Sequence, residues 1–167
     1  MNLYRFSPIQ NEEELRNALV HTHAACHRLC KQSFGKYLPV AGNIGIFCHY
    51  DDEYIFLDTL QDSITDKTQT MLRKYYRFRT PFVVPSQGEI PGATYTHLYI
   101  RKPDPYRFQV GDVDFLLDQP AYTKQKHILL EGIGIRGARM FPRTDLDMIE
   151  LFDPDIDALA YIRTNTL

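Results

Sequence analysis

The sequence predicts an α+β fold in which an N-terminal helix precedes an internally duplicated β-α-β-β unit. Three observations support this prediction. Residues 11–35 combine a helix-start signal with helical apolar spacing, two strand-like segments of similar pattern each precede a helix, and further strand-like runs follow each helix. The 167 residues, of which 44% are hydrophobic, suit a single domain over 1–167.

The first helix, over 11–35, is predicted from both of its ends. Asn11 can cap a helix whose first turn carries three glutamates, and acidic residues are favourable at that end of the helix dipole. Gly35 supplies a C-terminal stop. The helix also carries the densest group of soft metal ligands, which is His23, Cys26, His27 and Cys30. Zinc binding and burial in the core are both compatible with this spacing, and burial is the commoner outcome.

The rest of the chain divides into a first repeat, 42–110, and a second repeat, 111–153. The first repeat begins with a buried strand, and Asp51 then starts a helix. Its residues 65–93 are the least regular part of the chain and are expected to be an insertion. The second helix of the repeats is predicted to begin at Pro120. Further strands are predicted at 95–100, 108–117, 138–141, 148–152 and 159–162.

Aligning the two repeats places Asn43 opposite Asp112, and Gln109 opposite Glu150. All four residues lie in strand-like, mostly apolar surroundings. A buried carboxylate or amide is costly unless it is paired, binds a metal or faces a cavity. Because equivalent positions of a duplicated unit tend to meet near a pseudo-two-fold axis, we expect these four side chains to line a ligand site between the repeats.

A family resemblance supports this site. The second repeat has the sequence GDVDFLL before its helix and Ile149-Glu150-Leu151 near its end. It resembles a module of the vicinal oxygen chelate superfamily, which includes glyoxalases and bleomycin-resistance proteins. The resemblance lies mainly in 111–153, and it implies paired βαβββ modules around a metal or ligand. It also implies Asp112 and Glu150 as metal ligands, from the first and last strands of the module.

Two features depart from that family. None of the four site positions is histidine, and oxygen donors of this kind suit Mg²⁺, Mn²⁺ or Ca²⁺, or a site without metal. In addition, only Val110 and Gly111 separate the repeats. This short junction favours a ferredoxin-like sheet with 108–117 as one long strand, so both architectures remain open.

A second candidate site lies in the predicted insertion. The run from Arg73 to Arg79 interleaves four positive charges with aromatic rings, a pattern that can neutralise phosphates and stack bases. The candidate phosphate-binding residues are Arg73, Lys74, Arg77 and Arg79. The alternative is an amphipathic segment that packs its aromatic rings and covers them with arginine stems.

Bulk properties narrow the function classes. A net charge of -2 is unlike that of a general polyanion binder. Three irregularly spaced cysteines, no signal peptide and no long apolar run predict a cytoplasmic protein without a membrane span. His49 and His97 do not complete the motifs of a two-histidine phosphoesterase, because neither is followed by serine or threonine two positions later.

Three functions therefore remain open. The first is a small-molecule-binding protein or divalent-metal-assisted enzyme with a polar site at the repeat interface, where 65–93 would form a lid. The second is a ferredoxin-like module that binds RNA or a phosphorylated ligand. The third is a non-enzymatic interaction domain, such as a homodimer formed through an exposed sheet edge. The sequence assigns no catalytic residue.

Overall fold

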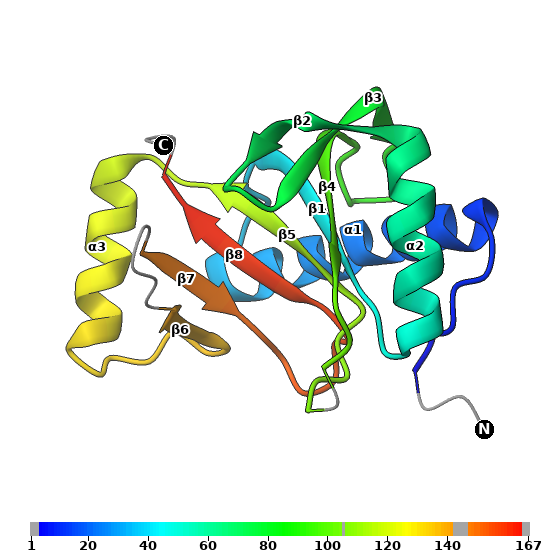
Figure 1. Ribbon diagram of the computed structural model, residues 1–167. Coiled ribbons are helices and arrows are strands. Elements are labelled where there is room, and N and C mark those ends of the chain that lie inside the picture. The colour runs from blue at the N-terminus through cyan, green and yellow to red at the C-terminus, as the bar shows by residue number, and fades with distance from the viewer. Residues whose placement is uncertain (1–3, 105, 142–146, 165–167) are drawn as a thin grey trace.

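The computed structural model describes residues 4–104, 106–141 and 147–164. Its helices are α1 (Glu12–Phe34), α2 (Asp51–Ile64) and α3 (Gln119–Leu130). Its strands are β1 (Val40–Phe47), β2 (Thr65–Met71), β3 (Tyr75–Val84), β4 (Ala93–Arg101), β5 (Gly111–Leu116), β6 (Ala138–Phe141), β7 (Met148–Leu151) and β8 (Leu159–Arg163). The strands form one mixed sheet in the order β2-β3-β4-β1-β5-β8-β7-β6 (Figure 1). The predicted α+β class and N-terminal helix are confirmed.

Both ends of α1 form for the expected reasons. The Asn11 side chain accepts a hydrogen bond from the backbone N–H of Glu14 at 2.9 Å, which satisfies one otherwise free amide of the first turn. Gly35 adopts a φ of 69° and donates its N–H to the carbonyl of Lys31. A residue without a β-carbon takes this left-handed conformation readily, so the helix ends there.

The two halves of the sheet have the same connectivity. β1 leads into α2 and three strands, the last of which, β4, pairs parallel with β1. β5 likewise leads into α3 and three strands, the last of which, β8, pairs parallel with β5. β1 and β5 pair antiparallel at the centre, where Gly45 lies opposite Asp112. The halves therefore join edge to edge through their first strands.

The structure differs from the sequence-based expectation over 65–93. This segment is not an irregular insertion, because it contains β2 and β3. In β3, buried Tyr75, Phe78 and Phe82 are separated by more exposed residues, and a register shift within the strand disturbs the simple alternation. β2 is an edge strand of mostly polar residues, and such a strand shows little apolar pattern.

The second half also has different limits from those expected. β5 begins at Gly111 and ends at Leu116, so no single strand covers 108–117. The fourth strand of this half is β8, which lies beyond the expected end of the repeat at residue 153. The predicted short strand at 159–162 is confirmed as β8, but its place beside β5 depends on strand pairing that a local pattern does not reveal.

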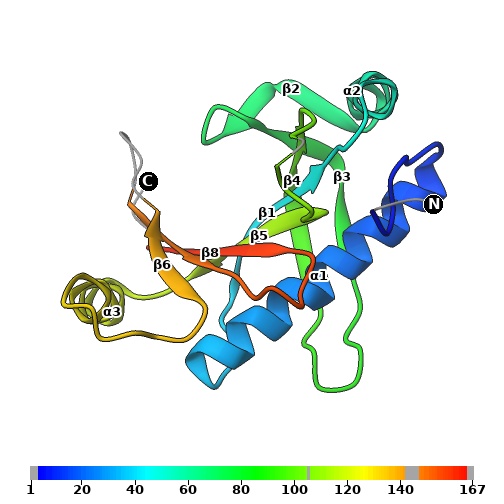
Figure 2. The ribbon, with the colours of Figure 1, turned by 90° about the horizontal axis from the view of Figure 1, so that it is seen from below.

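α1 crosses one face of the sheet and contacts strands of both halves (Figure 2). The Sγ of Cys26 donates a hydrogen bond to the carbonyl of Leu159 at 3.1 Å, which connects α1 to β8. α2 packs on β2, β3 and β4, and α3 packs on β6. The β2–β3 hairpin stands on the side of the sheet away from α1 (Figure 2). None of the described helices is long and apolar enough to cross a membrane.

The predicted group of His23, Cys26, His27 and Cys30 on α1 belongs to the core. His23 donates from Nε2 to the carbonyl of Pro91 at 3.1 Å and accepts at Nδ1 from the Tyr95 hydroxyl at 2.8 Å. Burial, with a further contribution from His27, lowers the pKa of His23 to about 4, so the ring is neutral near pH 7. Cys26 and Cys30 are buried free thiols. Within the described ranges, no group of three or more histidine, cysteine or acidic side chains is placed to hold a metal ion.

Candidate functional site

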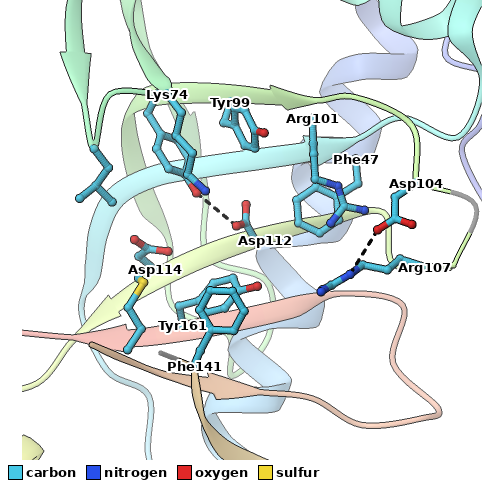
Figure 3. A pocket seen from close by; sticks show the side chains of 13 residues that line it. Phe47, Lys74, Tyr99, Arg101, Asp104, Arg107, Asp112, Asp114, Phe141 and Tyr161 are labelled. Carbon is cyan, nitrogen blue, oxygen red and sulfur yellow. Dashed lines mark hydrogen bonds and ion pairs between the residues drawn. The ribbon is translucent and has the colours of Figure 1, made fainter. Parts of the chain in front are cut away.

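A pocket of about 280 Å³ lies between the two halves of the sheet (Figure 3). Its position follows from the alternation of side chains along β5. The Phe115 ring contacts His27 of α1, so Val113 and Phe115 face the core, whereas Asp112 and Asp114 face the pocket. The lining residues are Phe47, Leu72, Lys74, Tyr75, Tyr99, Arg101, Asp104, Arg107, Asp112, Asp114, Phe141, Met148 and Tyr161.

Asp112 is held at the centre of this pocket. Its carboxylate Oδ2 accepts a hydrogen bond from the Tyr75 hydroxyl at 3.1 Å, while Oδ1 has no hydrogen-bond partner among the described residues. Burial raises the pKa of Asp112 to about 6; Lys74 opposes this rise and Asp114 adds to it. A β-carbon at Gly45 would overlap the Asp112 carboxylate, so the glycine on the neighbouring strand makes room for it.

Asp114 lies two positions further along the same strand and is also fully buried. Its Oδ2 accepts from the Nε of Arg163, itself buried, at 3.2 Å, and its Oδ1 has no partner in the part of the chain that the structure describes. Burial raises the pKa of Asp114, and the Arg163 charge opposes that rise. The buried side chain of Asn43 lies beside Asp114 and also opposes the rise in its pKa.

Two cations line the pocket against aromatic rings. The Lys74 ammonium lies 4.7 Å from the Tyr99 ring centroid, and the Arg101 guanidinium lies 3.5 Å from that of Phe47 (Figure 3). Nε and Nη2 of Arg101 are buried, and no described residue bonds either of them. Burial is the main cause of a lowered pKa for Arg101. A third cation, Arg107, is paired with Asp104 at 3.4 Å.

Lys74 is positioned by a strained turn. Leu72 and Arg73 connect β2 to β3 with φ values of 53° and 59°, and the N–H of Lys74 donates to the carbonyl of Met71. Two consecutive positive φ angles define a tight hairpin turn that normally contains asparagine or glycine. Side chains with a β-carbon are disfavoured there. The turn directs Leu72 and Lys74 over the pocket.

The four residues predicted to share a site are placed unequally. Asn43 and Asp112 lie on the pocket side of β1 and β5. Glu150 lies in β7, where its carboxylate accepts from the Tyr161 hydroxyl at 3.0 Å, and Tyr161 lines the pocket. Gln109 lies between β4 and β5 and does not line the pocket. The alignment that paired Gln109 with Glu150 therefore does not match the strand positions.

The predicted metal ligands, Asp112 and Glu150, are engaged by other groups. The Glu150 carboxylate forms an ion pair with Arg139 and accepts from its Nε at 2.7 Å. Asp112 is bonded to Tyr75 and lies near Lys74. These donors are cationic or phenolic, so the surroundings neutralise carboxylates rather than gather them around a cation. The residues do not fit a divalent metal site.

Of the predicted phosphate-binding residues, only Lys74 lines the pocket. Arg73 lies in the turn before it. Arg77 donates from Nη1 to Gln69 at 2.8 Å, and Arg79 lines a separate groove beside α1.

Several pocket residues were not singled out in the sequence. Asp114 could have been found, because residues 111–116 of β5 place a second carboxylate two positions after Asp112, on the same strand face. Tyr99 and Arg101 are likewise two positions apart in β4, so they lie on the same face of that strand. Their position beside Asp112 depends on the pairing of β4 with β1 and of β1 with β5.

A comparison with family models, curated proteins and solved structures found no match for this chain.

Proposed function

We propose that this chain is a small-molecule-binding protein of the vicinal oxygen chelate type, without the metal, whose pocket is equipped for proton transfer by Asp112. The observation that carries the proposal is the Asp112 carboxylate, which is fully buried at a pocket between the two halves and has a pKa raised to about 6. Perturbed carboxylates of this kind concentrate at functional sites.

The fold supports the first part of the proposal. Each half has the order strand, helix and three strands, and in each the fourth strand pairs parallel with the first. Paired βαβββ modules of this type cup a ligand between them, as the resemblance in 111–153 implies. A ferredoxin-like βαββαβ unit is less compatible with this chain, because that unit has four strands and the sheet of this protein has eight.

The chemistry of the pocket supports the second part. A general base is most effective when its pKa lies near the working pH, and burial places the pKa of Asp112 at about 6. Oδ1 is the carboxylate oxygen that stays buried and unbonded among the described residues, since Tyr75 holds Oδ2. Lys74 stabilises the carboxylate form, so Asp112 can accept a proton from a bound ligand and later return it.

The proposal is tested by carboxyl-detected NMR on protein labelled at aspartate. We expect one carboxyl resonance to titrate with a midpoint near pH 6, and the same resonance to be absent from Asp112→Asn. Asp51→Asn, at an exposed position, is the matched control and should leave that titration in place. A small-molecule panel screened by amide chemical shifts should then perturb the amides of Lys74, Tyr99 and Tyr161.

Two results would contradict the proposal. One is an Asp112 carboxyl that titrates at the ordinary value for aspartate, which would mean that the pocket is open to water and does not tune the group. The other is a set of binders whose shifts map to the groove beside α1, lined by Arg16 and Phe82, and leave the pocket amides unchanged.

A further inference from the structure

Among the described residues, no carboxylate forms a direct ion pair with Arg101, although Asp112 and Asp104 lie close enough to raise its pKa. Its guanidinium stacks on Phe47, with two of its nitrogens buried and without hydrogen-bond partners among the described residues. The nearest acid along the chain, Asp104, is already paired with Arg107. A partly buried guanidinium with unbonded nitrogens is costly, and its planar array of N–H donors matches a carboxylate or phosphate.

Another part of the pocket lining has unused acceptors. Asp112 and Asp114 each keep one carboxylate oxygen, Oδ1, that is buried and unbonded within the described chain. A ligand that approaches these oxygens must bring a hydrogen-bond donor, because two carboxylates repel a second acceptor. Hydroxyl and amine groups meet this requirement.

The walls between these polar groups are aromatic. Phe47, Tyr99, Phe141 and Tyr161 all line the same pocket (Figure 3). A volume of about 280 Å³ admits a small molecule and excludes a folded macromolecule. The acceptors and the donors therefore select two different ends of one compact ligand.

We infer that the pocket binds a small organic acid that also carries a hydroxyl or amine group, with the acid held by Arg101 and the donor group held by Asp112 and Asp114. This inference rests on the proposed function, because it assigns a ligand class to the same pocket. It places the donor-bearing carbon next to Asp112, the group proposed to exchange a proton.

The test is isothermal titration with two matched series of probes. The aromatic series is mandelate, phenylacetate, which lacks the hydroxyl, and mandelamide, which lacks the charge. The small series is glycolate, acetate and glycolamide. Within a series, we expect the hydroxy acid to bind most tightly, and each probe that lacks one group to bind roughly tenfold more weakly, the loss of about one good hydrogen bond to a charged group.

Variants assign the two ends of the ligand. Arg101→Gln should abolish the preference for mandelate over mandelamide, and Arg101→Lys should retain only part of it, because lysine lacks the bidentate geometry. Arg28→Gln, at an exposed position on α1, should keep the full preference. Thermal melting of each variant shows whether it is folded, and Arg101→Lys keeps the test valid if Arg101→Gln does not fold.

The inference is wrong if the amide binds as tightly as the acid, if Arg101→Gln keeps the preference, or if neither series binds at millimolar concentration. These results are separable from failure of the proposed function. An Asp112 carboxyl that still titrates near pH 6, with pocket amides perturbed by other compounds, would leave the proton-transfer pocket standing and remove only the acid-binding assignment.

Discussion

The two faces of the central sheet handle buried polar groups in opposite ways. On the α1 face, His23 is neutral and bonded at both ring nitrogens, and the rest of the contact is mainly apolar. On the pocket face, Asp112, Asp114 and Arg101 are charged groups with buried atoms that no described residue bonds. Both faces are formed by the same strands, and successive residues alternate between them.

The difference shows where stability and function are separated in this fold. Apart from Thr22, whose buried Oγ1 no described residue bonds, satisfied polar groups and packed apolar side chains stabilise the α1 face. Unsatisfied charges destabilise the pocket face, and such groups are retained in proteins mainly where they act on a ligand. Substitutions on the two faces should therefore change the free energy of unfolding in opposite directions.

The largest effect is expected on the α1 face. Phe115→Ala removes a fully buried ring that packs on His27, and it should lower the free energy of unfolding by about 3–5 kcal/mol. Urea denaturation followed by circular dichroism measures the change. A loss below about 1 kcal/mol would mean that this face is not the packed core and would remove the contrast between the faces.

Acid should weaken the α1 face next. The pKa of His23 is lowered to about 4 from 6.5, so the folded protein favours the neutral ring. The stability that this provides is present above pH 6.5 and is lost as pH falls toward 4. We expect His23 alone to remove about 2 kcal/mol between pH 7.5 and 5, partly offset by the opposite contribution of Asp112. At pH 5 the NMR resonances of the His23 ring should still be those of the neutral imidazole. A titration midpoint near pH 6.5 would contradict the lowered pKa of His23.

On the pocket face, a substitution should stabilise the protein. The pKa of Asp112 is raised to about 6 from 3.8, so the folded protein favours the protonated carboxyl. The contribution of this group to the free energy of unfolding is fully present below pH 3.8 and is lost as pH rises through 6. Asp112→Asn does not titrate, and we expect it to gain about 1–2 kcal/mol at pH 8, with the gain shrinking toward pH 4. Denaturation at both pH values measures this, and a destabilised variant at pH 8 would reverse the comparison.

The smallest expected effect is at the turn that carries Lys74. Replacing Leu72 and Arg73 by Asn and Gly matches the residues to their positive φ angles and should raise the free energy of unfolding by about 1 kcal/mol. Because Leu72 also lines the pocket, the same change should weaken ligand binding. Higher stability without weaker binding would show that the strained turn serves only to connect two strands.

The sequence was sufficient where one local signal determines one structure. The first helix was predicted from Asn11 and Gly35, since caps act on their own neighbours. Asp112 was predicted to face a cavity because a buried carboxylate in an apolar strand is costly, and it does line the pocket. Arg101 was missed because its position depends on the pairing of β4 with β1, which no pattern within β4 reveals.

The errors have similar causes. β2 was read as part of an irregular insertion because an edge strand has little need of apolar residues. Gln109 was included because the alignment used β7 where β8 is the strand that returns beside β5. Polar character alone could not distinguish Glu150, whose carboxylate is bound by Arg139 and Tyr161, from Asp112, which keeps an unbonded oxygen.

The course of α1 has a consequence for how the chain folds during synthesis. This helix precedes every strand of the sheet in the chain, yet the strands that cover its apolar side include β8, which follows all the others. The hydrogen bond from Cys26 to the carbonyl of Leu159 spans almost the whole chain. Contacts of such long sequence separation form slowly. Part of the apolar side of α1 therefore stays uncovered until β8 has been made, although β1 and β5, which also contact α1, precede β8 in the chain.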